Sequence, residues 1–132
     1  MRESTIARRT LETDIEVALN LDGAGTADVS TGVGFFDHML TAFARHGCFD
    51  LSARVKGDYE VDDHHTVEDT GIVLGAAFRE ALADKKGIRR FGDAFVPMDE
   101  TLVMAAVDIS GRGQAFYEVD PKVERIGSFD TQ

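Results

Sequence analysis

The sequence is poor in cysteine and has no tryptophan, and it contains no long apolar run. Its single cysteine, Cys48, excludes an internal disulfide framework, so we expect a reducing, cytoplasmic location. Cys48 follows Gly47 and precedes an apolar segment, which favours a small buried residue without a catalytic role. No stretch approaches the ~20 apolar residues of a membrane span, and the polar start MRESTIARRT differs from a secretory signal. We therefore expect neither membrane insertion nor export.

Basic residues are also scarce relative to acidic ones. The chain has 14 Lys and Arg against 24 Asp and Glu, which gives a formal net charge of −10. This balance argues against nucleic acid and against an anionic membrane as partners, because both need a basic surface. It still permits a phosphorylated metabolite where a few arginines converge. The 132 residues and 43% hydrophobic content suffice for a single compact domain with a sizeable core.

The hydrophobic pattern first has the period of a β-strand. Residues 11–23 alternate as a half-buried strand ending in an Asp-Gly turn, and a short strand around Ala27–Ser30 would pair with it. The side chains expected on the buried face are Ile15, Val17, Leu19 and Leu21. Residues 51–61 predict two more strands joined by a turn at Gly57 and Asp58.

Two segments have a helical period instead. Residues 32–47 predict a helix closed by Gly47 as its C-cap, and residues 63–87 predict a longer helix stopped by Gly87. The packed stripe expected on the long helix is Val67, Gly71, Leu74, Phe78 and Leu82. Gly71 and Gly75, one turn apart, suggest very close approach by another element.

The pattern then begins again. Glu12–Gly23 (ETDIEVALNLDG) resembles Glu100–Gly111 (ETLVMAAVDISG), and GFFD at 34–37 returns as GSFD at 127–130. These matches favour an internal duplication with a period of about 90 residues over two similar strands in one sheet. We predict a first, metal-binding repeat at 1–90 and an incomplete second repeat at 91–132. The fold class is α+β, a duplicated βαβ-type unit with helices on one face of a mixed β-sheet.

The stretch DDHHTVED at 62–69 predicts a metal site. Residues four apart share a helix face, so His64 and Glu68 can converge on one ion, whereas His65 points elsewhere. The spacing indicates two metals, or one metal with a supporting histidine, and His38 is the candidate companion of His65. Imidazole and carboxylate donors suit manganese, iron or zinc. Four such ligands cannot enclose two ions, so a second copy or another subunit must complete the site.

An alternative interpretation is a solvated acidic helix start that happens to contain two histidines. The neighbouring aspartates fit a helix N-cap, first-turn dipole partners or supports of the metal ligands; they are Asp62, Asp63 and Asp69. His46, two turns beyond His38, either lines the pocket or caps its helix.

The sequence resembles the imidazoleglycerol-phosphate dehydratases, manganese-dependent lyases of histidine biosynthesis. The segments that carry the resemblance are RRTLETDIEVALNLDG, GFFDHMLTAFARHG, GDYEVDDHHTVEDTGIVLG, KKGIRRFGDAFVPMDETL and DISGRG. The resemblance implies a duplicated fold similar to ribosomal protein S5 domain 2, here with a truncated second repeat. It also implies conversion of imidazoleglycerol phosphate to imidazoleacetol phosphate and water, with two manganese ions in each complete site.

The resemblance also implies roles for individual residues. Glu12 would be the general acid/base, and Arg90 and Arg112 would contact the substrate phosphate. His38 and His65 would serve one manganese, and His64 and Glu68 the other. Taken on their own, Glu12 is an ordinary exposed strand glutamate, Arg90 a helix-end charge and Arg112 a turn residue. The substrate-binding set is Glu12, His38, His46, His64, His65, Glu68, Arg90 and Arg112.

The leading hypothesis is a dehydratase chain with incomplete sites that is inactive or weakly active alone. Family members form 24-subunit shells, and for this chain we expect self-association into a smaller assembly such as a trimer. The alternative is a non-catalytic, metal-dependent binding or assembly module, which would use the histidines but not Glu12 or the arginines. A hydrolase ranks last, because no signature such as H-E-x-x-H occurs.

Overall fold

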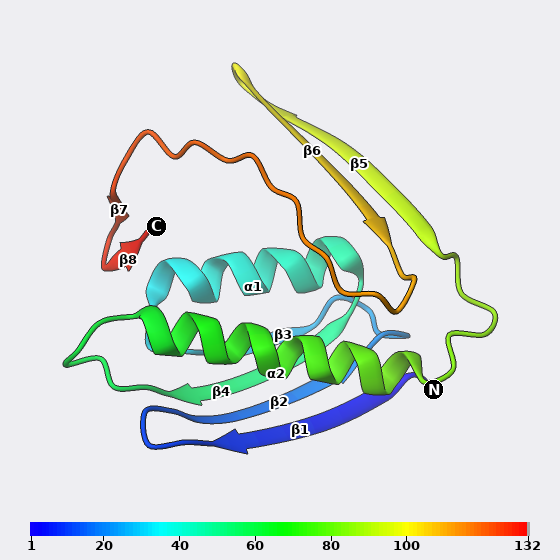
Figure 1. The fold of residues 1–132 in the computed structure, drawn as a ribbon, viewed down its shortest axis with the longest axis horizontal. Helices are drawn as coiled ribbons and strands as arrows, with labels where there is room; N and C mark the ends of the chain where they lie inside the picture. Colours follow the sequence, from blue (N-terminus) through cyan, green and yellow to red (C-terminus); the bar gives the residue numbers. More distant parts are fainter. Residues whose placement is uncertain (132) are drawn as a thin grey trace. The chain divides into compact units, whose positions relative to one another are not determined.

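The computed structural model describes residues 1–131 and is built around one mixed sheet (Figure 1). Its strands are β1 (Glu3–Arg9), β2 (Asp14–Asn20), β3 (Ala27–Ser30) and β4 (Asp50–Lys56), in the spatial order β1-β2-β4-β3. The β1–β2 and β2–β4 pairs are antiparallel, while β3 and β4 are parallel. A parallel pair needs a crossover, and α1 (Gly34–Gly47) supplies it.

The alternating side chains of β2 give the sheet its buried face. Ile15, Val17 and Leu19 are at most 2% exposed, and the register places Val17 beside Ala53 and Leu19 beside Leu51. Because alternate residues of a strand share one face, these side chains form one continuous apolar surface. The strand predicted within residues 11–23 is thus confirmed, over the shorter span of β2, whereas the strand predicted at Ala27–Ser30 pairs with β4 and not with β2.

Both α1 and α2 (His64–Leu82) cover that apolar face (Figure 1). Leu40 and Ala44 of α1 join Val73 and Ala77 of α2 in the same buried cluster as the strand residues. The prediction of an α+β fold with helices on one face of a mixed sheet is confirmed.

The predicted packed stripe of α2 is confirmed only in part, since Leu74 and Phe78 pack against the core but Gly71 is exposed. Its buried residues are Thr66, Asp69, Thr70, Val73, Ala77 and Ala81. The helix approaches the sheet with this row of mostly small side chains, and the larger Leu74 and Phe78 flank it, half-buried. The approach is close enough for the Ser4 hydroxyl of β1 to donate to the Ala77 carbonyl at 2.8 Å.

Two further predictions are wrong for the described chain: the close approach at the helix glycines and the second strand within residues 51–61. Gly71 and Gly75 are exposed, and a Cβ on either would meet nothing within 4 Å among the described residues. The close approach expected there is therefore not made within the described chain. Only β4 forms in 51–61, because the chain leaves the sheet at Gly57 and runs as a loop to α2.

The end of α1 corrects two further predictions. Cys48, not Gly47, is the C-cap, with φ 57° in the left-handed region, and its N–H bonds the Arg45 carbonyl. Cys48 is exposed rather than buried. A left-handed cap directs the chain away from the helix axis, which leaves this side chain facing outward.

The contacts divide the chain into two compact units, where the sequence suggests one domain. The first joins Met1–Ala83 to the residues from Pro121 onward, including the short pair β7 (Arg125–Ile126) and β8 (Phe129–Asp130). The second, Asp84–Asp120, contains the antiparallel hairpin β5 (Phe91–Met98) and β6 (Thr101–Asp108).

The two segments matched by the suspected duplication both contain the second strand of an antiparallel hairpin. Glu12–Gly23 contains β2, and Glu100–Gly111 contains β6. A duplication predicts this correspondence, and the division at residue 90 stays a prediction. Within the described part of the chain, no helix is both long and apolar enough to cross a membrane.

Candidate metal centre

The first turn of α2 presents two histidines in different directions. The backbone N–H of His64 donates to Asp62 Oδ1 at 2.8 Å, whereas the N-cap Asp63 makes no side-chain capping bond. Of the predicted capping aspartates, Asp62 therefore serves the helix start. The imidazole rings of His64 and His65 lie 5.7 Å apart at 77° to each other. Adjacent helical side chains diverge by about 100°, which separates their partners.

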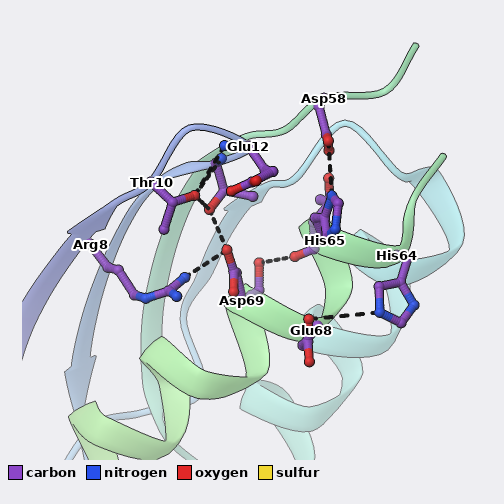
Figure 2. A network of polar contacts seen from close by, with 11 residues as sticks. Arg8, Thr10, Glu12, Asp58, His64, His65, Glu68 and Asp69 are labelled. Atoms are coloured by element: carbon purple, nitrogen blue, oxygen red, sulfur yellow. Dashed lines mark hydrogen bonds and ion pairs between the residues drawn. The ribbon is translucent and has the colours of Figure 1, made fainter. Parts of the chain in front are cut away.

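His64 and Glu68 converge, as their spacing predicts. His64 Nε2 lies 3.7 Å from Glu68 Oε2, and both side chains are more than half exposed. Both atoms are close enough for one divalent ion to be bound by them together, so this pair would supply an imidazole and a carboxylate ligand to such an ion (Figure 2).

His65 has a different partner. Its Nδ1 lies 2.9 Å from Asp58 Oδ2, in the loop that precedes α2 (Figure 2). The hydrogen bond to Asp58 raises the pKa of His65 above its ordinary value, and the charge of Glu12 adds to this effect. Glu12 therefore lies near enough to His65 to act on it electrostatically.

The remaining predicted ligands lie on α1. His38 stands one turn into the helix and His46 in its last turn, and both are exposed. Among residues 1–131, no three His, Cys, Asp or Glu side chains come close enough to enclose a metal ion. The described chain thus forms a two-residue pair at His64 and Glu68, and does not bring His38 into a larger set.

Glu12 occupies the turn between β1 and β2. It is exposed, and its N–H donates to Thr10 Oγ1 at 3.1 Å. The Thr10 N–H donates to the Thr13 carbonyl at 2.8 Å, which closes the turn. Glu12 is therefore a turn residue, not the strand glutamate that alternation alone suggests.

A buried polar network ties this turn to α2. The Thr13 hydroxyl donates to Asp69 Oδ2 at 2.6 Å, and Arg8 forms an ion pair with the same oxygen at 2.6 Å (Figure 2). The Thr13 hydrogen bond, together with Arg8, lowers the pKa of Asp69. Sequence reasoning marked Asp69 as a supporting residue but missed Arg8 and Thr13. The available signal was the pair of threonines, Thr10 and Thr13, placed three residues apart across the turn.

A cavity of about 610 Å³ adjoins the His64 and Glu68 pair. The segment after Pro121 contributes Arg125, Ser128 and Phe129 to its wall. Phe129 also contacts Phe35 at the start of α1, with ring centroids 5.3 Å apart. The cavity places both polar and aromatic groups beside the candidate ligands.

The two predicted phosphate-binding arginines lie in the second unit. Arg90 Nε and a terminal guanidinium nitrogen donate to the Asp108 carboxylate at 2.6 and 3.0 Å, which raises the pKa of Arg90. Arg112 lies in the turn after β6, where its N–H donates to Ser110 Oγ at 3.1 Å. Neither residue lies in a helix.

Comparison with known proteins agrees with the motifs. The family model described as imidazoleglycerol-phosphate dehydratase matches residues 31–132. The imidazoleglycerol-phosphate dehydratase of Caldanaerobacter subterraneus subsp. tengcongensis is 58% identical over all 132 residues, which correspond to 68% of its length. The enzyme of Methanosarcina mazei is also 58% identical, over 69% of its length.

A solved structure extends the likeness to the fold. The crystal structure of imidazoleglycerol-phosphate dehydratase from Staphylococcus aureus aligns with 98% of this chain and 70% of its own, with a TM-score of 0.85 and 37% identity. The chain thus spans about two thirds of the length of these relatives. The chain belongs to the imidazoleglycerol-phosphate dehydratase family.

Proposed function

We propose that this chain carries one half of a two-metal dehydratase site and acts on imidazoleglycerol phosphate. The family membership makes it a hydro-lyase of histidine biosynthesis. The observation that carries the metal proposal is the divergence of two adjacent histidines. His64 converges with Glu68, whereas His65 turns to Asp58. Adjacent ligands facing different partners serve two ions more readily than one.

The donor atoms fit hard or borderline divalent ions. His64 and Glu68 supply an imidazole and a carboxylate, and we propose Mn²⁺, with iron or zinc as the alternatives that these donors also accept. His65, with His38 as companion, would hold the second ion. Bound at these residues, the ions would act as Lewis acids that favour loss of the N–H proton from the substrate imidazole, so that the electron-rich ring can expel the neighbouring hydroxyl, which leaves as water.

Glu12 is the proposed acid/base. Its turn is held against α2 through Thr13 and Asp69, and its negative charge contributes to the raised pKa of His65. An exposed carboxylate on a fixed turn can take the proton from the substrate carbon next to the one that loses its hydroxyl. The product of this dehydration is an enol, which becomes the ketone imidazoleacetol phosphate.

Arginines would bind the phosphate end of the substrate. Arg90 already holds a carboxylate through two donors of its fork, which is the geometry that a phosphate also accepts. A phosphate would therefore have to replace Asp108. Arg112 is proposed for the same role from its place in SGRG, and His46 as a wall of the substrate pocket.

The incomplete ligand sets require further ligands from outside the described residues. Because the described residues hold no group of three ligands, we propose that each site is completed by ligands from a second copy of the motif, from another subunit, or from both. The 24-subunit shell and the trimer remain proposals, as does a cytoplasmic location. An exposed apolar hairpin supplies surface for such association, since Phe95, Met104 and Val107 are all more than half exposed.

The test is dehydration of imidazoleglycerol phosphate by the chain with Mn²⁺, following imidazoleacetol phosphate. We expect little or no turnover by the chain alone. Turnover should appear when the chain is fused to the part of the Caldanaerobacter relative that the match does not cover. Absence of activity in the fusion, at unchanged Mn²⁺ affinity, would favour the non-catalytic binding module instead.

A further inference from the structure

The contact between Asp58 and His65 determines which ring nitrogen is free. An ionised aspartate can only accept hydrogen bonds, so His65 Nδ1, 2.9 Å from Asp58 Oδ2, must carry the hydrogen. In the neutral ring this leaves the lone pair on Nε2. We propose that Asp58 is a positioning residue that orients His65 and holds it in the tautomer whose Nε2 can bind a divalent cation. This inference rests on the proposed function of His65.

The loop before α2 is built to hold Asp58 in place. Gly57 lies against the first turn of α2, where a Cβ would overlap the hydroxyl of the buried Thr66. Only glycine lets the backbone run this close to the helix. The result is that the next residue, Asp58, lies beside His65.

A second anchor fixes the other side of the loop. The Tyr59 hydroxyl donates to the Thr31 carbonyl at 2.7 Å, and the Val61 N–H donates to the Asp58 carbonyl at 2.8 Å. The Asp58 side chain is 16% exposed, against 40% for His65. The carboxylate is therefore the fixed partner, and the ring is the one that it orients.

Stability alone does not account for the aspartate. Asp58 Oδ1 is buried and has no hydrogen-bond partner among the described residues. Burying an unpaired polar atom costs free energy, which offsets what the bond to His65 contributes. Only one oxygen of the Asp58 carboxylate has a hydrogen-bond partner, and that partner is a candidate metal ligand. Carboxylates that orient metal-binding histidines make the same contact.

The first measurement needs neither metal nor activity. A long-range ¹H–¹⁵N spectrum of the ¹⁵N-labelled chain at pH 9 reports the tautomer of each neutral histidine, and His65→Gln assigns the signal. We expect His65 in the Nδ1–H form. Asp58→Ala removes the acceptor, so the ring should shift to the Nε2–H form that histidine favours in water. Glu60→Ala, an exposed carboxylate of the same loop, is the matched control and should change nothing.

The second measurement follows free Mn²⁺ by electron paramagnetic resonance during titration. Asp58→Ala should weaken binding by about 10- to 100-fold, the range for outer partners of metal ligands, while Glu60→Ala should not. An Nε2–H ring in the unmodified chain, an unchanged tautomer in Asp58→Ala, or equal Mn²⁺ affinity in both would overturn the proposal. If the unmodified chain binds no Mn²⁺, the metal function fails, and the spectrum still decides whether Asp58 orients His65.

Discussion

The Thr13 hydroxyl lies 2.6 Å from Asp69 Oδ2 and joins the Glu12 turn to the helix that carries the candidate ligands. Arg8 reaches the same oxygen at 2.6 Å. The Asp69 side chain is only 10% exposed, so neither partner is easily replaced by water. One buried carboxylate thus sets the position of β1, the turn and α2 together.

Asp69→Asn should destabilise the chain. The change removes the negative charge opposite Arg8 but keeps an oxygen that Thr13 can reach. We expect the free energy of unfolding at pH 7 to fall by about 1–3 kcal/mol, measured by urea denaturation, because a largely buried charge pair is broken. Asp14→Asn is the control, since its 3.6 Å pair with Arg9 is exposed and should matter by less than about 1 kcal/mol. Equal losses in both variants would contradict the network.

The His65 and Asp58 pair should make stability depend on pH. The native pKa of His65 is raised, so the stabilisation is fully present below the unfolded value of about 6.5 and is lost as pH rises through the native value. Asp58→Asn should therefore cost more free energy of unfolding at pH 6 than at pH 9, in paired urea titrations. Glu60→Gln should show the same difference at both pH values. A cost that grows with pH would contradict the assignment.

The sheet and the helices were predictable because their apolar residues repeat strongly. Ile15, Val17 and Leu19 alternate through β2, and no neighbouring pattern competes with that period. The face of α2 was not predictable, because an apolar row through Val67 and Phe78 lies beside the buried row. The close approach to β1, where the Ser4 hydroxyl donates to the Ala77 carbonyl, favoured smaller side chains, and this choice depends on the partner sheet.

In the candidate site, too, contacts set by local spacing were predictable and long-range contacts were not. The His64 and Glu68 convergence follows from local helix geometry, so four residues of spacing sufficed to predict it. The link from Thr13 to Asp69 spans 56 positions and depends on how the sheet meets the helix. No local pattern encodes such a contact, and the same holds for Asp58, which the loop geometry aims at His65.

Glu12→Gln should separate catalysis from binding. The substitution keeps the size of the side chain and the hydrogen bond from the residue's own N–H to Thr10 Oγ1, but it removes the proton acceptor. In the fusion that completes the sites, we expect a loss of turnover of at least about 100-fold, with Mn²⁺ affinity unchanged. The measurement is kcat beside a Mn²⁺ titration. Glu16→Gln, an exposed glutamate on β2, is the control. Retained turnover in Glu12→Gln would remove Glu12 from the proposed chemistry.

Substituting alanine for Gly75 and for Gly57 should change the free energy of unfolding in opposite directions. Gly75 has free space around it in α2, so Gly75→Ala should raise the free energy of unfolding by about 0.5–1 kcal/mol through helix propensity. Gly57→Ala should instead destabilise the chain, because the new methyl group would overlap Thr66. Urea denaturation of both variants tests this pair of signs.

The same Gly75→Ala variant also tests whether another polypeptide packs on α2. If a partner covers that helix face closely in an assembly, the added methyl group should weaken self-association while the single chain gains stability. Sedimentation velocity over a range of concentrations measures the first effect, and urea denaturation at low concentration the second. Unchanged association would show that the exposed face of α2 at Gly75 lies outside any interface between chains, and the close approach suggested by the glycine spacing would then be wrong for the assembly as well.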